Sequence, residues 1–136
     1  MSLSGTLASC LVAASMVHHV PAEDLVGIMV VEGGRPGLES PNTNGTKDLG
    51  IWQINTIWVP ERAAAWGVDY GTAYKLIRDD PCINVTVAAY VLRKGTDEAG
   101  SRLGGVARYH SANPKFGIPY LLKFLQALKR LKSGAA

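Results

Sequence analysis

Glu32 is the residue whose sequence context best suits acid–base chemistry. It ends the segment IMVVE, and it follows Leu25, Ile28 and Met29 at the spacing that places side chains on one face of a helix. Burial on an apolar face and the negative end of the helix dipole both raise the pKa of a carboxyl group. Such a group stays protonated near neutral pH and can act as a general acid. The alternative is a solvent-facing glutamate at a fraying helix end.

The elements that would position Glu32 are mostly helical. The polar segment 35–48, RPGLESPNTNGTKD, is too rich in turn-forming residues to hold a regular element, and a loop this long in a small domain is usually functional. By composition alone, LGIWQINTIWV (49–59) could be a strand. Hydrophobic periodicity and capping residues predict helices over 7–20, 22–32, 70–77, 81–95, 99–110 and 118–132. We therefore expect a mainly α protein with little or no sheet.

Composition limits the remaining possibilities. The chain has 136 residues, 47% hydrophobic and 18% charged, which fits a single domain spanning 1–136. No apolar run is long enough to span a bilayer. The amino-terminal segment has no Lys or Arg cluster, so we expect that a signal peptide is absent from this sequence. The net charge is +3, and the basic residues are partly concentrated in the tail, which is either a solvated helix face or a surface attracted to an anionic polymer.

Metal and cofactor sites are not expected. His18 and His19 are adjacent and would point to different faces of a helix, and no phosphate-binding loop or dinucleotide motif is present. Cys10 and Cys82 are too few and too far apart for a zinc site with cysteine ligands. In an oxidising compartment a bridge between them would contribute roughly 4 kcal/mol by closing a long loop, and two buried free thiols are the alternative.

Four sequence blocks together carry a family resemblance. Glu32, NTNGTKDLGIWQIN, DPCINVTVAAYVL and VARYHSANP occur in this order between about Cys10 and Tyr120. In order and spacing they resemble the lytic transglycosylases of the lysozyme-like (SLT) superfamily. The closer resemblance is to small periplasmic members that accompany secretion, conjugation and pilus machinery. It implies a lysozyme-like helical domain with a sugar-binding cleft, in which 49–59 is a turn leading into a helix.

The resemblance also implies a set of site residues. The catalytic glutamate of the family falls on Glu32. Gln53 and Asn55 match positions that line the sugar cleft, and Tyr109 matches a tyrosine that lies close to the catalytic acid and helps to orient it. His110 and Ser111 follow it and complete the expected substrate-binding residues.

The same resemblance implies a Cys10–Cys82 disulfide and therefore an oxidising periplasm. The sequence departs from the common family pattern at three positions. Gly33 stands where many relatives have Ser, His110 replaces the commoner Asn, and Arg108 stands where Ala is frequent.

The implied reaction cleaves the β-1,4 bond between N-acetylmuramic acid and N-acetylglucosamine in peptidoglycan. In the family the muramyl 6-hydroxyl attacks its own anomeric carbon and gives a 1,6-anhydro product, so that one acid suffices. Asp48 is a possible second carboxylate, and Trp52 or Trp58 is either a sugar platform or a core residue. The expected partners are glycan strands and components of a secretion, conjugation or pilus apparatus, with no nucleic acid. The alternatives are a lysozyme-type muramidase that uses water and a noncatalytic wall-binding assembly protein.

Overall fold

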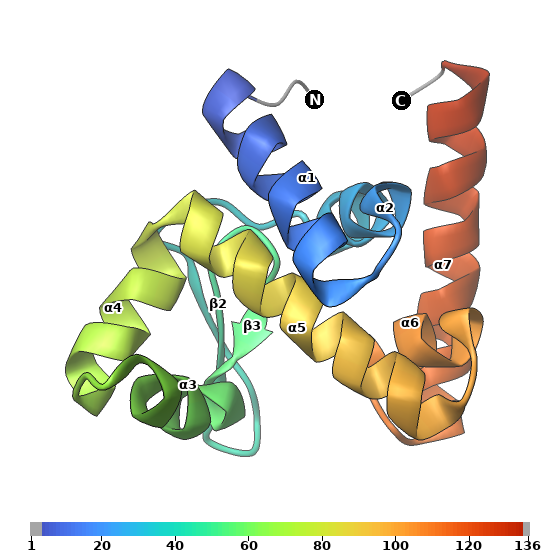
Figure 1. Cartoon of the computed structure of the whole chain (residues 1–136). Coiled ribbons are helices and arrows are strands. Elements are labelled where there is room, and N and C mark those ends of the chain that lie inside the picture. The colour runs from blue at the N-terminus through green and yellow to red at the C-terminus, as the bar shows by residue number, and fades with distance from the viewer. Residues whose placement is uncertain (1–3, 135–136) are drawn as a thin grey trace.

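Seven helices and one small sheet make up the fold (Figure 1), and the computed structural model describes residues 4–134. The predicted domain 1–136 thus extends past the described residues at both ends. In chain order the elements are α1 Gly5–His18, α2 Ala22–Glu32, β1 Glu39–Pro41, β2 Lys47–Leu49, β3 Ile54–Asn55, the short 3₁₀ helix η1 Thr56–Trp58, α3 Val59–Trp66, α4 Tyr70–Asp79, α5 Pro81–Ala99, α6 Arg102–His110 and α7 Pro114–Ser133. The prediction of a mainly α, lysozyme-like fold is confirmed.

The start of α5 shows how local sequence sets a helix boundary. Asp80 accepts hydrogen bonds from the backbone N–H groups of Cys82 at 2.9 Å and Ile83 at 3.1 Å, and Pro81 occupies the first helical position. A carboxylate cap followed by proline satisfies backbone donors that have no partner within the helix. The predicted start of this helix is confirmed.

The other end of α5 differs from the prediction. The helix continues through Gly95 to Ala99 and ends at Gly100, so α6 begins at Arg102 and not at 99. A Cβ atom on Gly95 would lie 3.2 Å from the carbonyl oxygen of Gly105, and one on Gly105 would lie 2.7 Å from the Cα of Thr96. These glycines therefore let α5 and α6 approach closely, which offsets their low helix propensity.

The absence of regular structure predicted for 35–48 is wrong, because β1 and β2 form an antiparallel hairpin there. Its turn is closed by the Asn42 N–H, which donates to the Thr46 carbonyl at 2.8 Å, while Asn44 accepts from the Thr46 N–H at 3.0 Å. The turn-forming residues occupy the turn, and the strands on either side are only three residues long. β3 adds to β2 and completes the sheet.

For the segment between β2 and α3, composition indicates a strand and the family resemblance a turn leading into a helix, and the structure contains both. Residues 50–53 form a turn, two residues form β3, and η1 then leads into α3. Gly50 and Gln53 both have positive φ, at 73° and 52°. The family-based expectation of a turn leading into a helix is therefore confirmed, with a short strand inserted.

Asn84 fastens this turn to the centre of the molecule. Its side chain is 1% exposed, and its amide NH₂ donates to the Leu49 carbonyl at 3.0 Å and to the Ile77 carbonyl at 2.8 Å. Its oxygen accepts from the Trp52 N–H at 2.8 Å. One side chain thus satisfies three buried backbone groups from separate parts of the chain, and this holds the turn in place.

The core lies around α5, which passes through the middle of the fold (Figure 1). Trp52 is fully buried there, and its indole N–H donates to the Leu25 carbonyl at 2.8 Å. At the edge of the core, the buried Asp24 accepts two hydrogen bonds from Arg102, at 2.5 and 2.8 Å. This bidentate pair joins the start of α2 to the start of α6.

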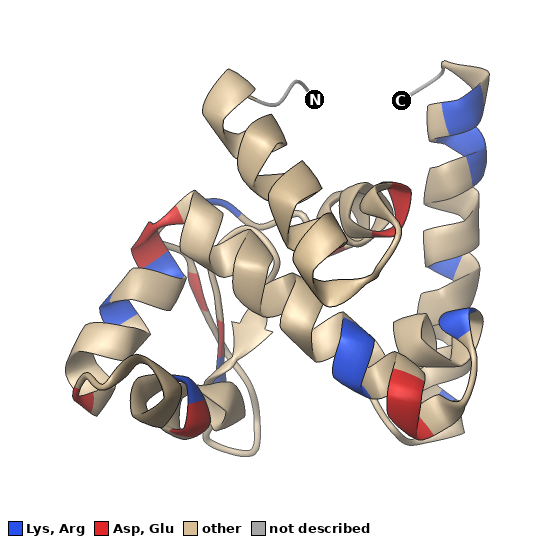
Figure 2. Ribbon diagram, viewed as in Figure 1, with Lys and Arg blue, Asp and Glu red and all other residues tan. Residues whose placement is uncertain are grey.

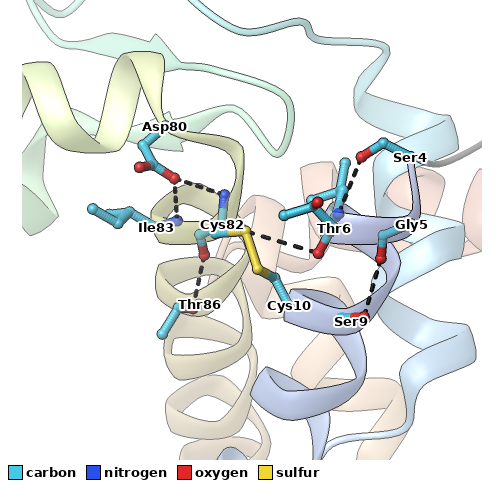
Figure 3. The surroundings of a disulfide bond; sticks show 10 residues. Ser4, Gly5, Thr6, Ser9, Cys10, Asp80, Cys82, Ile83 and Thr86 are labelled. Atoms are coloured by element: carbon cyan, nitrogen blue, oxygen red, sulfur yellow. Dashed lines mark hydrogen bonds between the residues drawn. A yellow bond between two sulfur atoms is a disulfide. The ribbon is translucent and has the colours of Figure 1, made fainter.

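The predicted disulfide between Cys10 and Cys82 is present and links α1 to the first turn of α5 (Figure 3). The two Cα atoms are 5.3 Å apart, within the usual range for a disulfide. Within residues 4–134, no helix combines the length and apolar character needed to cross a membrane.

Candidate active site

A cleft of about 550 Å³ brings the sequence-predicted site residues together. The sheet and its hairpin form one side of it, and the end of α2 and the carboxyl end of α6 form the other. All seven predicted side chains line this cleft: Glu32, Asp48, Gln53, Asn55, Tyr109, His110 and Ser111. The roles of these residues stay predictions, and their proximity makes a common function physically feasible.

Glu32 is the last residue of α2 and projects from the core toward the cleft. The preceding residues on its helix face, Leu25, Ile28 and Met29, are buried as the helical spacing predicts. Gly33 ends the helix in the left-handed conformation with φ of 62°. This geometry sets the carboxyl group against apolar surroundings at the edge of a polar cleft.

Burial raises the pKa of Glu32 to about 7, from 4.5 for an unperturbed glutamate. The negative charge of Asp48 acts in the same direction, and a hydrogen bond from Tyr120 opposes both. Near neutral pH both forms of the carboxyl group are therefore populated. A group in this condition can give up a proton in one step and accept one in the next.

Tyr120 is a residue in contact with Glu32 that sequence reasoning missed. Its hydroxyl donates to Oε2 of Glu32 at 2.8 Å, and its ring stacks on the imidazole of His110 with a centroid distance of 4.8 Å and an interplanar angle of 2°. The only signal in the sequence is a tyrosine on the apolar face of the last helix, where a buried hydroxyl needs a partner. That partner is Glu32, 88 residues earlier in the chain.

Tyr109 lies near Glu32 and hydrogen-bonds to the backbone. Its hydroxyl donates to the Trp52 carbonyl at 2.7 Å, so it does not donate to Glu32. Burial raises the pKa of Tyr109 well above its ordinary value, and the nearby charges of Glu32 and Asp48 add to this effect. Tyr109 therefore stays neutral and ties α6 to the 50–53 turn beside the acid.

The opposite side of the cleft is formed by paired strand residues. Asp48 on β2 lies directly opposite Asn55 on β3, and the Asn55 amide donates to Oδ1 of Asp48 at 3.2 Å. The Gln53 amide donates to the Gly50 carbonyl at 2.9 Å and so stabilises its own turn. The strand pairing and these side-chain hydrogen bonds place two amides and one carboxylate along the same wall.

The two tryptophans considered as sugar platforms lie in different environments. Trp52 is a core residue with no exposed surface. Trp58 is partly buried, lines the cleft and packs edge-on against Tyr90 at a centroid distance of 6.0 Å. Trp58 is the tryptophan that a bound sugar can reach.

Metal ligation finds no support in residues 4–134, where no group of three or more His, Cys, Asp or Glu side chains is placed to hold an ion. His18 packs edge-on against Tyr90 at 6.1 Å, and burial lowers its pKa. His19 adopts the left-handed conformation that ends α1.

Comparison with known proteins identifies the family of the chain. The transglycosylase SLT domain family matches residues 9–121. The chain is also 31% identical to the invasion protein IagB of Salmonella typhimurium and of Salmonella typhi, over 141 aligned residues that cover all of this chain and 85% of each relative. The chain belongs to the transglycosylase SLT domain family.

Proposed function

We propose that the protein is a peptidoglycan lytic transglycosylase that cleaves the β-1,4 bond after N-acetylmuramic acid and forms a 1,6-anhydromuramyl end. The observation that carries this proposal is Glu32, a carboxyl group with a pKa of about 7 in a polar cleft, hydrogen-bonded by Tyr120. Family membership supports a peptidoglycan substrate. The chemistry then requires one proton donor and one acceptor, and one side chain can serve as both.

In the first step, protonated Glu32 donates its proton to the glycosidic oxygen, and the bond between that oxygen and the muramyl anomeric carbon breaks. Positive charge develops on the sugar, and Glu32 becomes a carboxylate. The Tyr120 hydroxyl then donates its hydrogen bond to a charged acceptor, which is stronger than a bond to the neutral acid. Tyr120 thus favours the ionised state that the step produces.

In the second step, the muramyl 6-hydroxyl oxygen bonds to the anomeric carbon while its proton passes to the Glu32 carboxylate. The products are a 1,6-anhydro sugar and a Glu32 that is protonated again. No water is consumed. The cleft must therefore hold the sugar so that its own hydroxyl faces the anomeric carbon. We assign this positioning to Gln53, Asn55 and Trp58, which line the cleft.

Asp48 is the possible second carboxylate in this cleft, and it supports the main alternative. In a lysozyme-type muramidase a second carboxylate stabilises the sugar cation or activates water. The Asn55 amide holds one oxygen of Asp48, which favours a supporting electrostatic role over direct attack. The noncatalytic wall-binding alternative gives no reason for a raised pKa at Glu32.

The cellular setting is also part of the proposal. The disulfide is typical of an oxidising compartment, and we place the protein in the periplasm, where it would open the wall locally for a secretion, conjugation or pilus machine. The similarity to relatives named invasion protein IagB is compatible with a role in invasion.

The fate of water in the reaction tests the proposed chemistry. Purified sacculi are digested in water labelled with heavy oxygen, and the muramyl ends are analysed by mass spectrometry. A transglycosylase gives anhydro ends without the label, whereas a muramidase places labelled oxygen on the reducing end. The same digest with Asp48→Asn measures whether a second carboxylate is required: a modest loss of rate with unchanged products supports the proposal.

A further inference from the structure

Acidic and basic residues are distributed differently before and after Glu98. None of its 11 acidic residues follows this position, yet seven of its 14 basic residues do: Arg102, Arg108, Lys115, Lys123, Lys129, Arg130 and Lys132. Figure 2 shows basic segments and no acidic one along α7. Helices α6 and α7 thus form a positively charged part of the molecule next to Glu32.

Three of these cations have acidic partners. Arg102 pairs with Asp24 and Glu23, and the other two pairs, Arg108 with Glu98 and Lys132 with Glu23, are longer, at 3.6 and 3.8 Å. Among the residues that the structure describes, no ion pair is formed by Lys115, Lys123, Lys129 or Arg130. The remaining positive charge is therefore available to a ligand.

Two of the unpaired lysines border a second hollow beside the catalytic cleft. This hollow has a volume of about 310 Å³ and shares Glu32, His110 and Phe116 with the cleft, so the two hollows adjoin at the acid. Lys115 and Lys123 lie on its α7 side. Glu32 is the one acidic residue among those that line it.

The positions of the two lysines on α7 suit an extended anionic ligand. They are eight residues apart, which corresponds to about 12 Å along a helix axis. Lys115 lies in the first turn of α7, where the helix dipole disfavours a cation. Between them the hollow is lined by the exposed ring of Phe116 and by Pro119. The surface thus offers two separated cations with an apolar stretch between them.

We infer that this hollow is a subsite for the carboxylates of the peptide stem attached to the muramyl residue at the scissile bond. The inference rests on the peptidoglycan substrate of the proposed function. A peptide stem projects sideways from its sugar, carries free carboxylates at intervals along its length, and has small apolar side chains between them. A glycan lying in the main cleft directs such a stem past Glu32 toward Lys115 and Lys123.

Binding to the inactive Glu32→Gln protein tests the inference without turnover. Three soluble ligands of equal sugar length are compared: a glycan that bears peptide stems, the same glycan stripped by an amidase, and an oligomer of N-acetylglucosamine. With both Lys115→Gln and Lys123→Gln, affinity for the peptide-bearing glycan is expected to fall about threefold to tenfold, as for two exposed charge pairs, and this loss is expected to shrink at high salt.

The matched control removes two lysines from the same helix but away from this hollow. Lys129 and Lys132 border a separate hollow against α6, and Lys129→Gln with Lys132→Gln is expected to leave the ratio of the affinities for peptide-bearing and stripped glycan unchanged. An equal loss in this control would mean general attraction to a polyanion and would overturn the inference.

Two other results would also overturn it. If the Lys115 and Lys123 changes weaken the stripped glycan as much as the peptide-bearing one, the two lysines recognise a feature that both glycans share, and the peptide stem is not that feature. If they weaken neither ligand, the hollow is no subsite. Failure of the proposed function is seen separately in the sacculus digest, because the native protein would then release either no product or labelled reducing ends while the binding preference persists.

Discussion

Replacing Glu32 by Gln is expected to stabilise the folded protein at alkaline pH, although it removes the catalytic acid. The pKa of Glu32 is about 7 in the fold, against 4.5 for an unperturbed glutamate. Because the folded pKa is the higher one, the stability linked to the protonated form is complete below pH 4.5 and is lost as the pH rises through 7. Glutamine stays neutral and avoids this loss.

The size of the effect follows from the two pKa values. The difference between 7 and 4.5, at about 1.4 kcal/mol for each pH unit, amounts to about 3.5 kcal/mol at most. This is a large fraction of the free energy of unfolding of a typical small domain. The ionised carboxylate therefore has a cost in stability above neutral pH, which is common for groups tuned for chemistry.

Denaturant unfolding of both proteins from about pH 4 to about pH 9, with the disulfide intact, measures the effect. The free energy of unfolding of Glu32→Gln relative to the native protein should increase by about 3 kcal/mol across this range. Glu98→Gln, at an exposed position in α5, removes one carboxylate and controls for net charge. Parallel stability curves for the native and Glu32→Gln proteins would refute the argument that burial sets the pKa of this acid.

Three further substitutions test the supporting structure. Tyr120→Phe removes the hydrogen bond that favours ionised Glu32, so the alkaline limb of the pH–rate profile should move to higher pH while the rate falls; an unmoved limb would contradict this role. Asn84→Ala leaves three buried backbone groups unpaired and should lower the free energy of unfolding by about 3–5 kcal/mol in denaturant titrations; a loss below about 1 kcal/mol would mean that water replaces the amide. Cys10→Ser opens the disulfide to Cys82 and should lower the melting temperature, with a stability loss of up to about 4 kcal/mol; an unchanged melting temperature would contradict a stabilising bridge.

Local patterns were sufficient to predict most helices and the position of Glu32. Helical spacing places Glu32 on the same face as Leu25 and Ile28, and both of these are buried. The cap formed by Asp80 and Pro81 specifies the start of α5 within a few neighbouring residues. Such features depend on interactions over one or two helical turns, which the sequence shows directly.

The features that escaped prediction depend on contacts between distant segments. The strands of the hairpin are three residues long, and pairing rather than periodicity defines them. The partner of Tyr120 is known only once α7 packs across the end of α2, and the partners of Asn84 come from separate parts of the chain. Similarly, the close approach of α5 and α6 at Gly95 and Gly105 makes α5 longer than propensity suggests.

Mass spectrometry of the products from purified sacculi, comparing the native protein with Glu32→Gln, tests the central claim most directly. The substitution is nearly isosteric and removes only the proton donor. We predict anhydromuropeptides from the native protein and none from the variant. Anhydromuropeptides released equally by both proteins would contradict the assignment of Glu32 as the acid, and reducing ends from the native protein would contradict the transglycosylase reaction.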